Sequence, residues 1–123
     1  MQITPIKCRS DFLRVAAKRR KWASPGLVLQ VDQTPYIDPE DKPLMRVGYT
    51  ASRRVGGAVE RNRAKRRLRA AVSRVMPLLA LPEYDYVLIA RKTTLTRNFE
   101  DLISDLSQAL SKTRTIRTNE RSN

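Results

Sequence analysis

The chain has 123 residues, an ordinary length for one domain, and its 41% of hydrophobic residues can fill one modest core. Lysine and arginine total 25 against 12 acidic residues, and the resulting net charge of +13 favours a polyanionic partner, nucleic acid before an anionic membrane. The lack of histidine and the single Cys8 exclude a disulfide within the chain, a zinc site and histidine-based catalysis. No run approaches the roughly 20 apolar residues of a membrane span, and the N-terminus does not resemble a signal peptide. We therefore expect a cytoplasmic protein that does not associate with membranes.

A short helix and a strand are the first elements that the sequence predicts. Ser10 can cap a helix over about 11–18, where the apolar side chains recur on one face. The basic run 18–21 breaks this pattern, and Pro25-Gly26 marks a turn. The apolar run 27–31 then predicts a strand.

The middle of the chain predicts a loop, a strand and the longest helix. Residues 32–44 contain three prolines and four acidic residues, which is typical of a loop. Residues 45–52 alternate between apolar and polar or small side chains, as a strand with one buried face does. Gly56-Gly57 forms a turn into a helix over about 58–76, which we expect Pro77 to end.

The last third of the chain predicts one more strand and one more helix. The apolar run 84–90 reads as a strand, and 93–97 as a polar turn. A helix over about 98–112 carries an apolar stripe, and Asn98 with Asp101 resembles a capping box at its start.

This order of elements predicts the α+β fold class. We expect a single α-β sandwich in which helices pack on one face of one mostly antiparallel sheet of about four strands. Besides the three strands above, the further strand is expected either between Ile3 and Cys8 or in part of the proline-rich loop. The whole chain, 1–123, is interpreted as one domain, whose charge favours binding to nucleic acid. Its ordered core is expected over about 6–112, followed by a basic, flexible tail at 113–123.

The most informative segment is 53–74, which holds nine basic residues and one acid, Glu60. On a helical wheel, the apolar residues gather on one side: Ala64, Leu68, Ala71, Val72 and Val75. The opposite side is a polar stripe of Asn62, Lys65, Arg66, Arg69 and Ser73, flanked by Arg63, Arg67 and Arg74. A solvated helix normally mixes charges so that i, i+4 pairs attract, whereas this face repels itself. Either it is an unusual charged solvent face, or it binds phosphate, which the guanidinium fork matches well.

The run from Arg53 to Arg69 resembles the signature of the bacterial ribonuclease P protein family. That signature reads basic-basic-hydrophobic-Gly-x-Ala-Val-x-Arg-Asn-Arg-x-Lys-Arg-x-hydrophobic-Arg, and the sequence matches every fixed position. Agreement extends to Arg46-Val47-Gly48-Tyr49, to 85–91 and to Asp11-Phe12-x-x-Val15, so that the resemblance covers about 6–110.

The resemblance implies a left-handed strand–helix–strand crossover, where chain physics alone predicts a right-handed one. It also implies that a partner RNA with bound Mg²⁺ removes the 5′ leader of precursor tRNA. This chain would then supply no catalytic residue and no metal ligand, and would need no obligate protein partner. The residues implied to bind the catalytic RNA are Arg53, Arg54, Arg61, Asn62, Arg63, Lys65, Arg66 and Arg69.

The resemblance further implies that a cleft between the first helix and the sheet holds the single-stranded leader. The residues predicted to line it are Phe12, Val15, Lys18, Arg19 and Trp22. An aromatic ring suits an unpaired strand because every base offers a π-face. Phe12 and Trp22 are alternatively core residues, since aromatic side chains often fill cores. The chain departs from the family at Ala16, where a second aromatic is frequent, and at Gly57, where asparagine is usual.

Two other classes of function compete with this interpretation. A structural RNA- or DNA-binding protein, ribosomal or histone-like, would show the same basic surface on this helix. An independent nuclease is disfavoured because the chain lacks histidine and an evident cluster of carboxylates for two metals. The acidic residues Asp32, Asp38, Glu40 and Asp41 lie in the proline-rich segment without further sign of a site.

Overall fold

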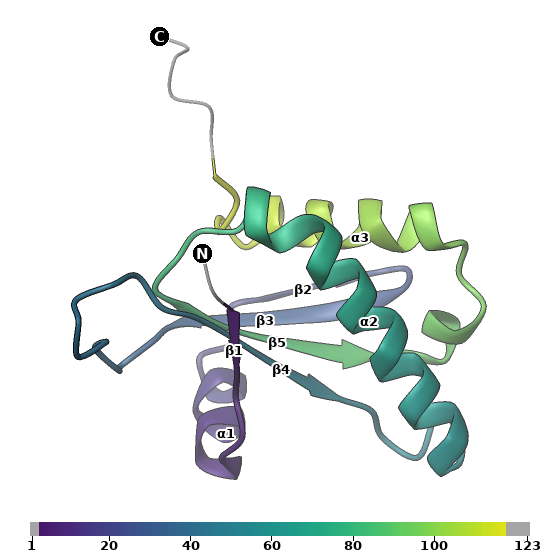
Figure 1. Ribbon diagram of the computed structural model, residues 1–123. Coiled ribbons are helices and arrows are strands. Elements are labelled where there is room, and N and C mark those ends of the chain that lie inside the picture. Colours follow the sequence, from purple (N-terminus) through teal and green to yellow (C-terminus); the bar gives the residue numbers. More distant parts are fainter. Residues whose placement is uncertain (1–2, 118–123) are drawn as a thin grey trace, which may run out of the picture.

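The structure is a computed structural model, in which residues 3–117 are described. Figure 1 shows one sheet with two helices on one side and the first helix on the other. In chain order the elements are β1 (Ile3–Pro5), α1 (Arg9–Ala17), β2 (Lys21–Ser24), β3 (Leu27–Gln33), β4 (Met45–Thr50), α2 (Ala58–Leu79), β5 (Tyr84–Ala90), the 3₁₀ helix η1 (Lys92–Leu95) and α3 (Phe99–Lys112).

The five strands of the sheet are arranged in the order β1-β4-β5-β3-β2. β1 and β5 both pair with β4 in parallel, while β3 pairs with β5 and β2 with β3 in antiparallel fashion. The α+β class is therefore confirmed, but the sheet is mixed and has five strands instead of about four mostly antiparallel ones. The two strands that complete it are the short edge strands β1 and β2.

The crossover from β4 through α2 to β5 is left-handed. In Figure 1 both parallel strands point to the right, α2 passes in front of the sheet, and β5 lies above β4. A right-handed crossover, the usual form, would place β5 below β4 in this view.

Both faces of the sheet are covered, because β5 is apolar on its two sides. Tyr86 and Leu88 face the main core, which α2 and α3 close. Val87 and Ile89 point the other way, into a smaller cluster with Val15 of α1. The expectation that helices cover one face only is therefore wrong, since α1 packs on the opposite face.

Two helix boundaries differ from those expected. The residue that precedes α1 is Cys8, which makes no side-chain cap, and Ser10 lies inside the first turn. Pro77 lies within α2, which continues to Leu79. A proline removes only one backbone N–H, and so close to the C-terminal end the helix loses a single hydrogen bond.

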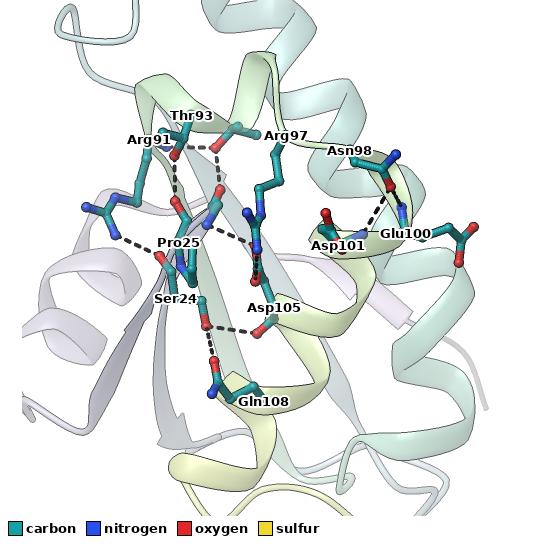
Figure 2. Close-up of polar contacts among 12 residues, drawn as sticks. Ser24, Pro25, Arg91, Thr93, Arg97, Asn98, Glu100, Asp101, Asp105 and Gln108 are labelled. Carbon is teal, nitrogen blue, oxygen red and sulfur yellow. Dashed lines mark hydrogen bonds and ion pairs between the residues drawn. The ribbon is translucent and has the colours of Figure 1, made fainter.

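The turn between β2 and β3 is attached to α3 and to η1 by buried polar contacts (Figure 2). The Asp105 carboxylate of α3 accepts hydrogen bonds from the Gly26 backbone N–H and the Arg97 Nε, each at 2.9 Å. Ser24 donates to the backbone carbonyl of Asp105 at 2.9 Å, and Thr93 donates to the carbonyl of Pro25 at 2.6 Å. These contacts fix η1, against which the basic helix α2 also rests.

The packed part of the chain extends beyond Lys112, where the flexible tail was expected to begin. Thr113 and Thr115 are buried, and Ile116 forms a β-bridge with Ala80. The core also includes β1, which precedes the expected start at residue 6. The rest of the predicted tail, 118–123, lies outside the described residues.

Candidate nucleic-acid interface

The apolar side of α2 fixes the direction in which its basic residues point. The predicted buried residues are confirmed, and Met76 joins them: Ala64, Leu68, Ala71, Val72, Val75 and Met76. The chain enters the helix through Gly56, whose φ of +148° is one that residues with a side chain rarely adopt. This turn places the arginine pair 53–54 beside the start of α2.

Most of the predicted RNA-binding residues are free of partners within the protein. Arg53, Arg54, Asn62, Arg63 and Arg66 are exposed, and Lys65 is half-buried. Within residues 3–117 none of the six side chains has a protein hydrogen-bond or ion-pair partner, since all of the contacts described for this surface involve other residues. We call these six residues the basic stripe.

The one acid near the start of α2 does not neutralise the basic stripe. The Oε1 of Glu60 accepts a hydrogen bond from the backbone N–H of Gly57 at 3.0 Å. It thereby caps the helix start in place of the side chain that Gly57 lacks. The carboxylate is turned back towards the helix terminus and, among the described residues, forms no ion pair with Arg63 or Arg66.

Arg61, Arg67 and Arg69 have contacts inside the protein. Arg61 donates to the carbonyl of Gly56 at 3.1 Å, and the Arg69 guanidinium lies 5.0 Å from the centre of the Tyr49 ring. Burial raises the pKa of Tyr49 to about 12 despite the positive charge of Arg69, so the ring stays neutral. The Arg67 guanidinium donates to three carbonyl groups around η1, those of Thr94, Leu95 and Arg97, at 2.7, 3.0 and 2.6 Å. Arg67 therefore attaches α2 to η1 instead of facing solvent.

The second predicted surface lies on the α1 side of the sheet. Phe12 is half-buried and packs against Ile6, Val15 and Val87. Its ring lies over Gly48, where a Cβ atom would come within 2.6 Å of two ring carbons. The glycine in β4 thus leaves room for the aromatic ring to approach the strand closely.

A half-exposed strip of sheet continues beyond Phe12. Ala23, Val28, Ile89 and Thr50 are neighbours in register across β2, β3, β5 and β4. Ala23 is exposed and the other three are half-buried, because α1 covers only the row that contains Val87 and Gly48. The strip offers a mixed apolar and hydroxyl surface next to an aromatic ring.

The structure brings only some of the predicted leader-binding residues together. Lys18 and Arg19 are exposed at the end of α1, the helix that carries Phe12. Val15 is fully buried, so its side chain is not available at the surface. Trp22 packs against the main core on the other face of the sheet, where the Lys112 Nζ lies 5.2 Å from its ring centre. Trp22 and Phe12 therefore cannot hold the same base.

A buried charge network, which the sequence did not reveal, attaches α1 to the sheet. The Asp85 carboxylate of β5 is fully buried and accepts hydrogen bonds from Arg46 of β4 at 2.9 and 2.6 Å and from Arg14 of α1. Arg14 also pairs with Asp32 of β3 at 2.5 Å. In the sequence, the sign of this network is Asp85, a single aspartate in the apolar run 84–90. The sequence does not indicate which arginine pairs with it.

Asp11 completes this network at the start of α1. Burial raises the pKa of Asp11, but hydrogen bonds from Arg14 and Arg46 outweigh it and hold the pKa below its usual value. The Tyr36 hydroxyl donates to the same carboxylate at 3.2 Å, and the Arg46 guanidinium lies 4.3 Å from the centre of the Tyr36 ring. The loop after β3 is thereby held against α1.

The described residues do not assemble a metal site or a membrane span. Between residues 3 and 117, no three side chains of the His, Cys, Asp or Glu type are placed to hold a metal ion. The three buried or half-buried carboxylates on the α1 side, those of Asp11, Asp32 and Asp85, are engaged by arginines. Over the same range, no helix combines the length and apolar character needed to cross a bilayer.

Comparisons with known proteins agree with this arrangement. The family model described as Ribonuclease P matches residues 3–114. The ribonuclease P protein component of Paramagnetospirillum magneticum is 52% identical over 107 residues, covering 87% of this chain and 80% of the relative. That of Caulobacter vibrioides is 47% identical over 105 residues, covering 85% of this chain and 67% of the relative.

Solved structures show the same fold at lower identity. The RNase P protein from Staphylococcus aureus has a TM-score of 0.71 at 22% identity, over 94% of this chain and all of that one. The protein from Thermotoga maritima has a TM-score of 0.68 at 21% identity, over 85% of this chain and 92% of that one. Together with the matched signature on α2, these findings show that the chain belongs to the bacterial ribonuclease P protein family, as a protein component of that tRNA-processing endoribonuclease.

Proposed function

We propose that this chain binds the catalytic RNA through the basic stripe of α2 and the 5′ leader of precursor tRNA on the α1 side of the sheet. In doing so it assists the Mg²⁺-dependent cleavage that gives the mature 5′ end. The observation that carries the proposal is the basic stripe itself, a row of cationic and amide side chains without intramolecular partners. Unpaired arginines on a rigid helix are suited to backbone phosphates, and Asn62 adds a donor and an acceptor for a base edge or ribose hydroxyl.

Arg61 and Arg69 belong to the RNA-binding set in a different way from the rest. Each has one contact within the protein, and each keeps further guanidinium donors that can reach a phosphate. We therefore assign to them a smaller share of the RNA affinity than to Arg63 and Arg66.

For the leader, the proposal uses Phe12, the half-exposed strip beside it, and the cations Lys18 and Arg19. A base stacks on an aromatic face without regard to its identity, which suits leaders of differing sequence. The strip formed by Val28, Ile89 and Thr50 continues this surface across three strands. A single strand can therefore lie across the sheet next to α1, with its phosphates directed towards solvent and the end of α1.

In this proposal the RNA subunit catalyses the cleavage and also binds most of the Mg²⁺. The carboxylates Asp11, Asp32 and Asp85 do not fit a metal site because two arginines engage them, and the chain has no histidine that could act as a base. We propose a single RNA-binding domain that acts in the cytoplasm without an obligate protein partner. The lone cysteine, exposed Cys8, is consistent with a reducing compartment.

The affinity of the chain for the catalytic RNA, measured over a range of salt concentrations, tests the role of the basic stripe. Arg63→Ala and Arg66→Ala should each weaken binding and reduce the slope of log affinity against log salt by about 1. Lys42→Ala is a suitable control, because Lys42 is exposed, distant in sequence from α2 and paired with Glu40 at 2.7 Å. Equal slopes for the wild type and both arginine variants would show that the basic stripe is only a solvated surface.

A further inference from the structure

A second concentration of positive charge lies where α1 and α3 end. A hollow of about 420 Å³ is lined by the α1–β2 turn and by the last residues of α3. Six residues surround it, five of them cationic: Arg19, Arg20, Lys21, Lys112, Thr113 and Arg114. We call this set the basic hollow. In Figure 1 the start of β2 and the end of α3 lie at the left, whereas the start of α2 lies at the lower right, so this charge is separate from the basic stripe.

Within residues 3–117, no acidic side chain neutralises the basic hollow. Its lining contains no carboxylate, and none of the five cations forms an ion pair in the part of the chain that the structure describes. Arg20 donates to the backbone carbonyls of Thr113 and Arg114, at 2.9 and 3.4 Å, which fixes the α1–β2 turn against the end of α3. The cations are thus held close together by the fold despite their mutual repulsion.

Two arginines of the basic hollow occupy backbone positions that would suit glycine better. Arg19 and Arg114 have φ values of 58° and 61°, in the left-handed region. Each directly follows the C-cap residue of its helix, Lys18 in α1 and Thr113 in α3. Glycine is the usual residue at this position because it adopts positive φ without steric cost. Both helices of this hollow instead carry an arginine there, although glycine would suit the backbone better.

We propose that the basic hollow binds a backbone phosphate of RNA, as a contact separate from the basic stripe. Several guanidinium and ammonium groups that converge on an open hollow match the charge and the multiple acceptors of a phosphodiester. The proposal rests on the function proposed above, since it takes the partner to be an RNA of the ribonuclease P reaction. The phosphate comes either from the precursor tRNA or from the catalytic RNA, because both offer the same chemistry.

The test uses the full chain with three RNAs, namely the catalytic RNA alone, and then precursor tRNA and mature tRNA bound to the assembled holoenzyme. The double variant Arg19→Gly, Arg114→Gly removes two cations and supplies the residue that the backbone prefers. Its thermal midpoint should therefore equal or exceed that of the wild type. Its affinity for at least one RNA should fall several-fold, and the corresponding salt slope should become shallower by about 1 for each phosphate that the variant no longer binds. Because Arg19 also belongs to the proposed leader surface, the single variant Arg114→Gly is measured beside it, and a loss that this single variant shows is attributed to the basic hollow.

The pattern across the three RNAs identifies the source of the phosphate. A loss of affinity confined to precursor tRNA places it in the leader, a loss with mature tRNA as well places it in the tRNA body, and a loss with the catalytic RNA places it in the RNA subunit. The control Lys7→Ala, Lys42→Ala removes the same formal charge at exposed positions outside the basic hollow. Its affinities and slopes should stay close to those of the wild type.

Two results would overturn the proposal. One is a folded double glycine variant that matches the wild type in affinity and salt slope with all three RNAs. The other is a control pair that loses as much affinity as the glycine pair, since net charge alone would then explain the effect. If the wild-type chain did not bind the catalytic RNA at all, the proposed function would fail first, and the basic hollow would lose its assigned partner with it.

Discussion

Replacing Phe12 by alanine should reduce the preference of the holoenzyme for precursor over mature tRNA. Stacking on one aromatic ring contributes roughly 1–3 kcal/mol per base, which corresponds to a loss of about fivefold to a hundredfold in that preference. Affinity for the catalytic RNA should barely change, because the contact proposed for that RNA uses α2. The quantity to measure is the ratio of dissociation constants for the two tRNAs, determined with the same RNA subunit.

The structure also sets the stability cost of this substitution. A fully buried phenylalanine loses about 3–5 kcal/mol on truncation to alanine, and Phe12 is only half-buried, so we expect about 2 kcal/mol. Most of the ring contacts are with the smaller cluster of Ile6, Val15 and Val87, and the main core does not depend on them. The variant should therefore stay folded at 25 °C with a lower thermal midpoint.

Two further variants separate stacking from packing. Phe12→Leu keeps an apolar side chain on the sheet but removes the π-face, so it should lose the precursor preference at a smaller cost in stability. Gly48→Ala keeps the ring but places a methyl group 2.6 Å from two of its carbons, which forces the ring away from β4. A folded Phe12→Ala protein with an undiminished preference for precursor tRNA would refute the placement of the leader beside α1.

The charged contacts of α1 and α2 give two more predictions. Arg67→Ala should lower the free energy of unfolding by roughly 1.5–3 kcal/mol, because it removes three hydrogen bonds to carbonyl groups around η1, and should leave the salt slope for catalytic RNA unchanged. Chemical denaturation and binding titrations check both parts, and a reduced slope at unchanged stability would instead place Arg67 on the RNA. The pKa of Asp11 is lower in the folded state than its ordinary value of 3.8. The ionised carboxylate therefore stabilises the fold above pH 3.8, and this stabilisation is lost as the pH falls through the folded pKa. The stability difference between the wild type and Asp11→Asn should therefore shrink below pH 3.8 in acid titrations, and a difference that grows there would contradict the network.

The long helix and the central strands could be predicted because their apolar residues follow clear patterns, periodic in α2 and β4 and continuous in β5. Ala64, Leu68 and Val72 recur at helical spacing, and Met45 and Val47 alternate with Arg46 and Gly48. The same rule predicted which side of α2 would be exposed. Its weakness appeared at Arg67, which lies beside the basic stripe but turns to η1, a partner about 30 residues away along the chain.

Strand β2 and the placement of α1 could not be predicted, because they depend on contacts between distant segments. Strand β1 was expected only as one of two alternatives for a further strand. Lys21, the last residue of the basic run 18–21, begins β2, so the local composition indicated a solvated turn. β1 has only three residues and pairs in parallel with a strand about 40 positions later. The grouping of Phe12 with Trp22 failed for a related reason, since the two residues lie on opposite faces of a sheet whose strand β2 was not recognised.

The most direct test of the account is the cleavage of precursor tRNA by the cognate catalytic RNA at a Mg²⁺ concentration too low for that RNA to act alone. Addition of the purified chain should restore accurate removal of the 5′ leader, and a variant that lacks both Arg63 and Arg66 should need more protein to do so. The chain without RNA should leave the precursor intact. Cleavage by the chain alone, or no stimulation of the RNA at any protein concentration, would contradict its assignment as the RNA-binding subunit of a ribozyme.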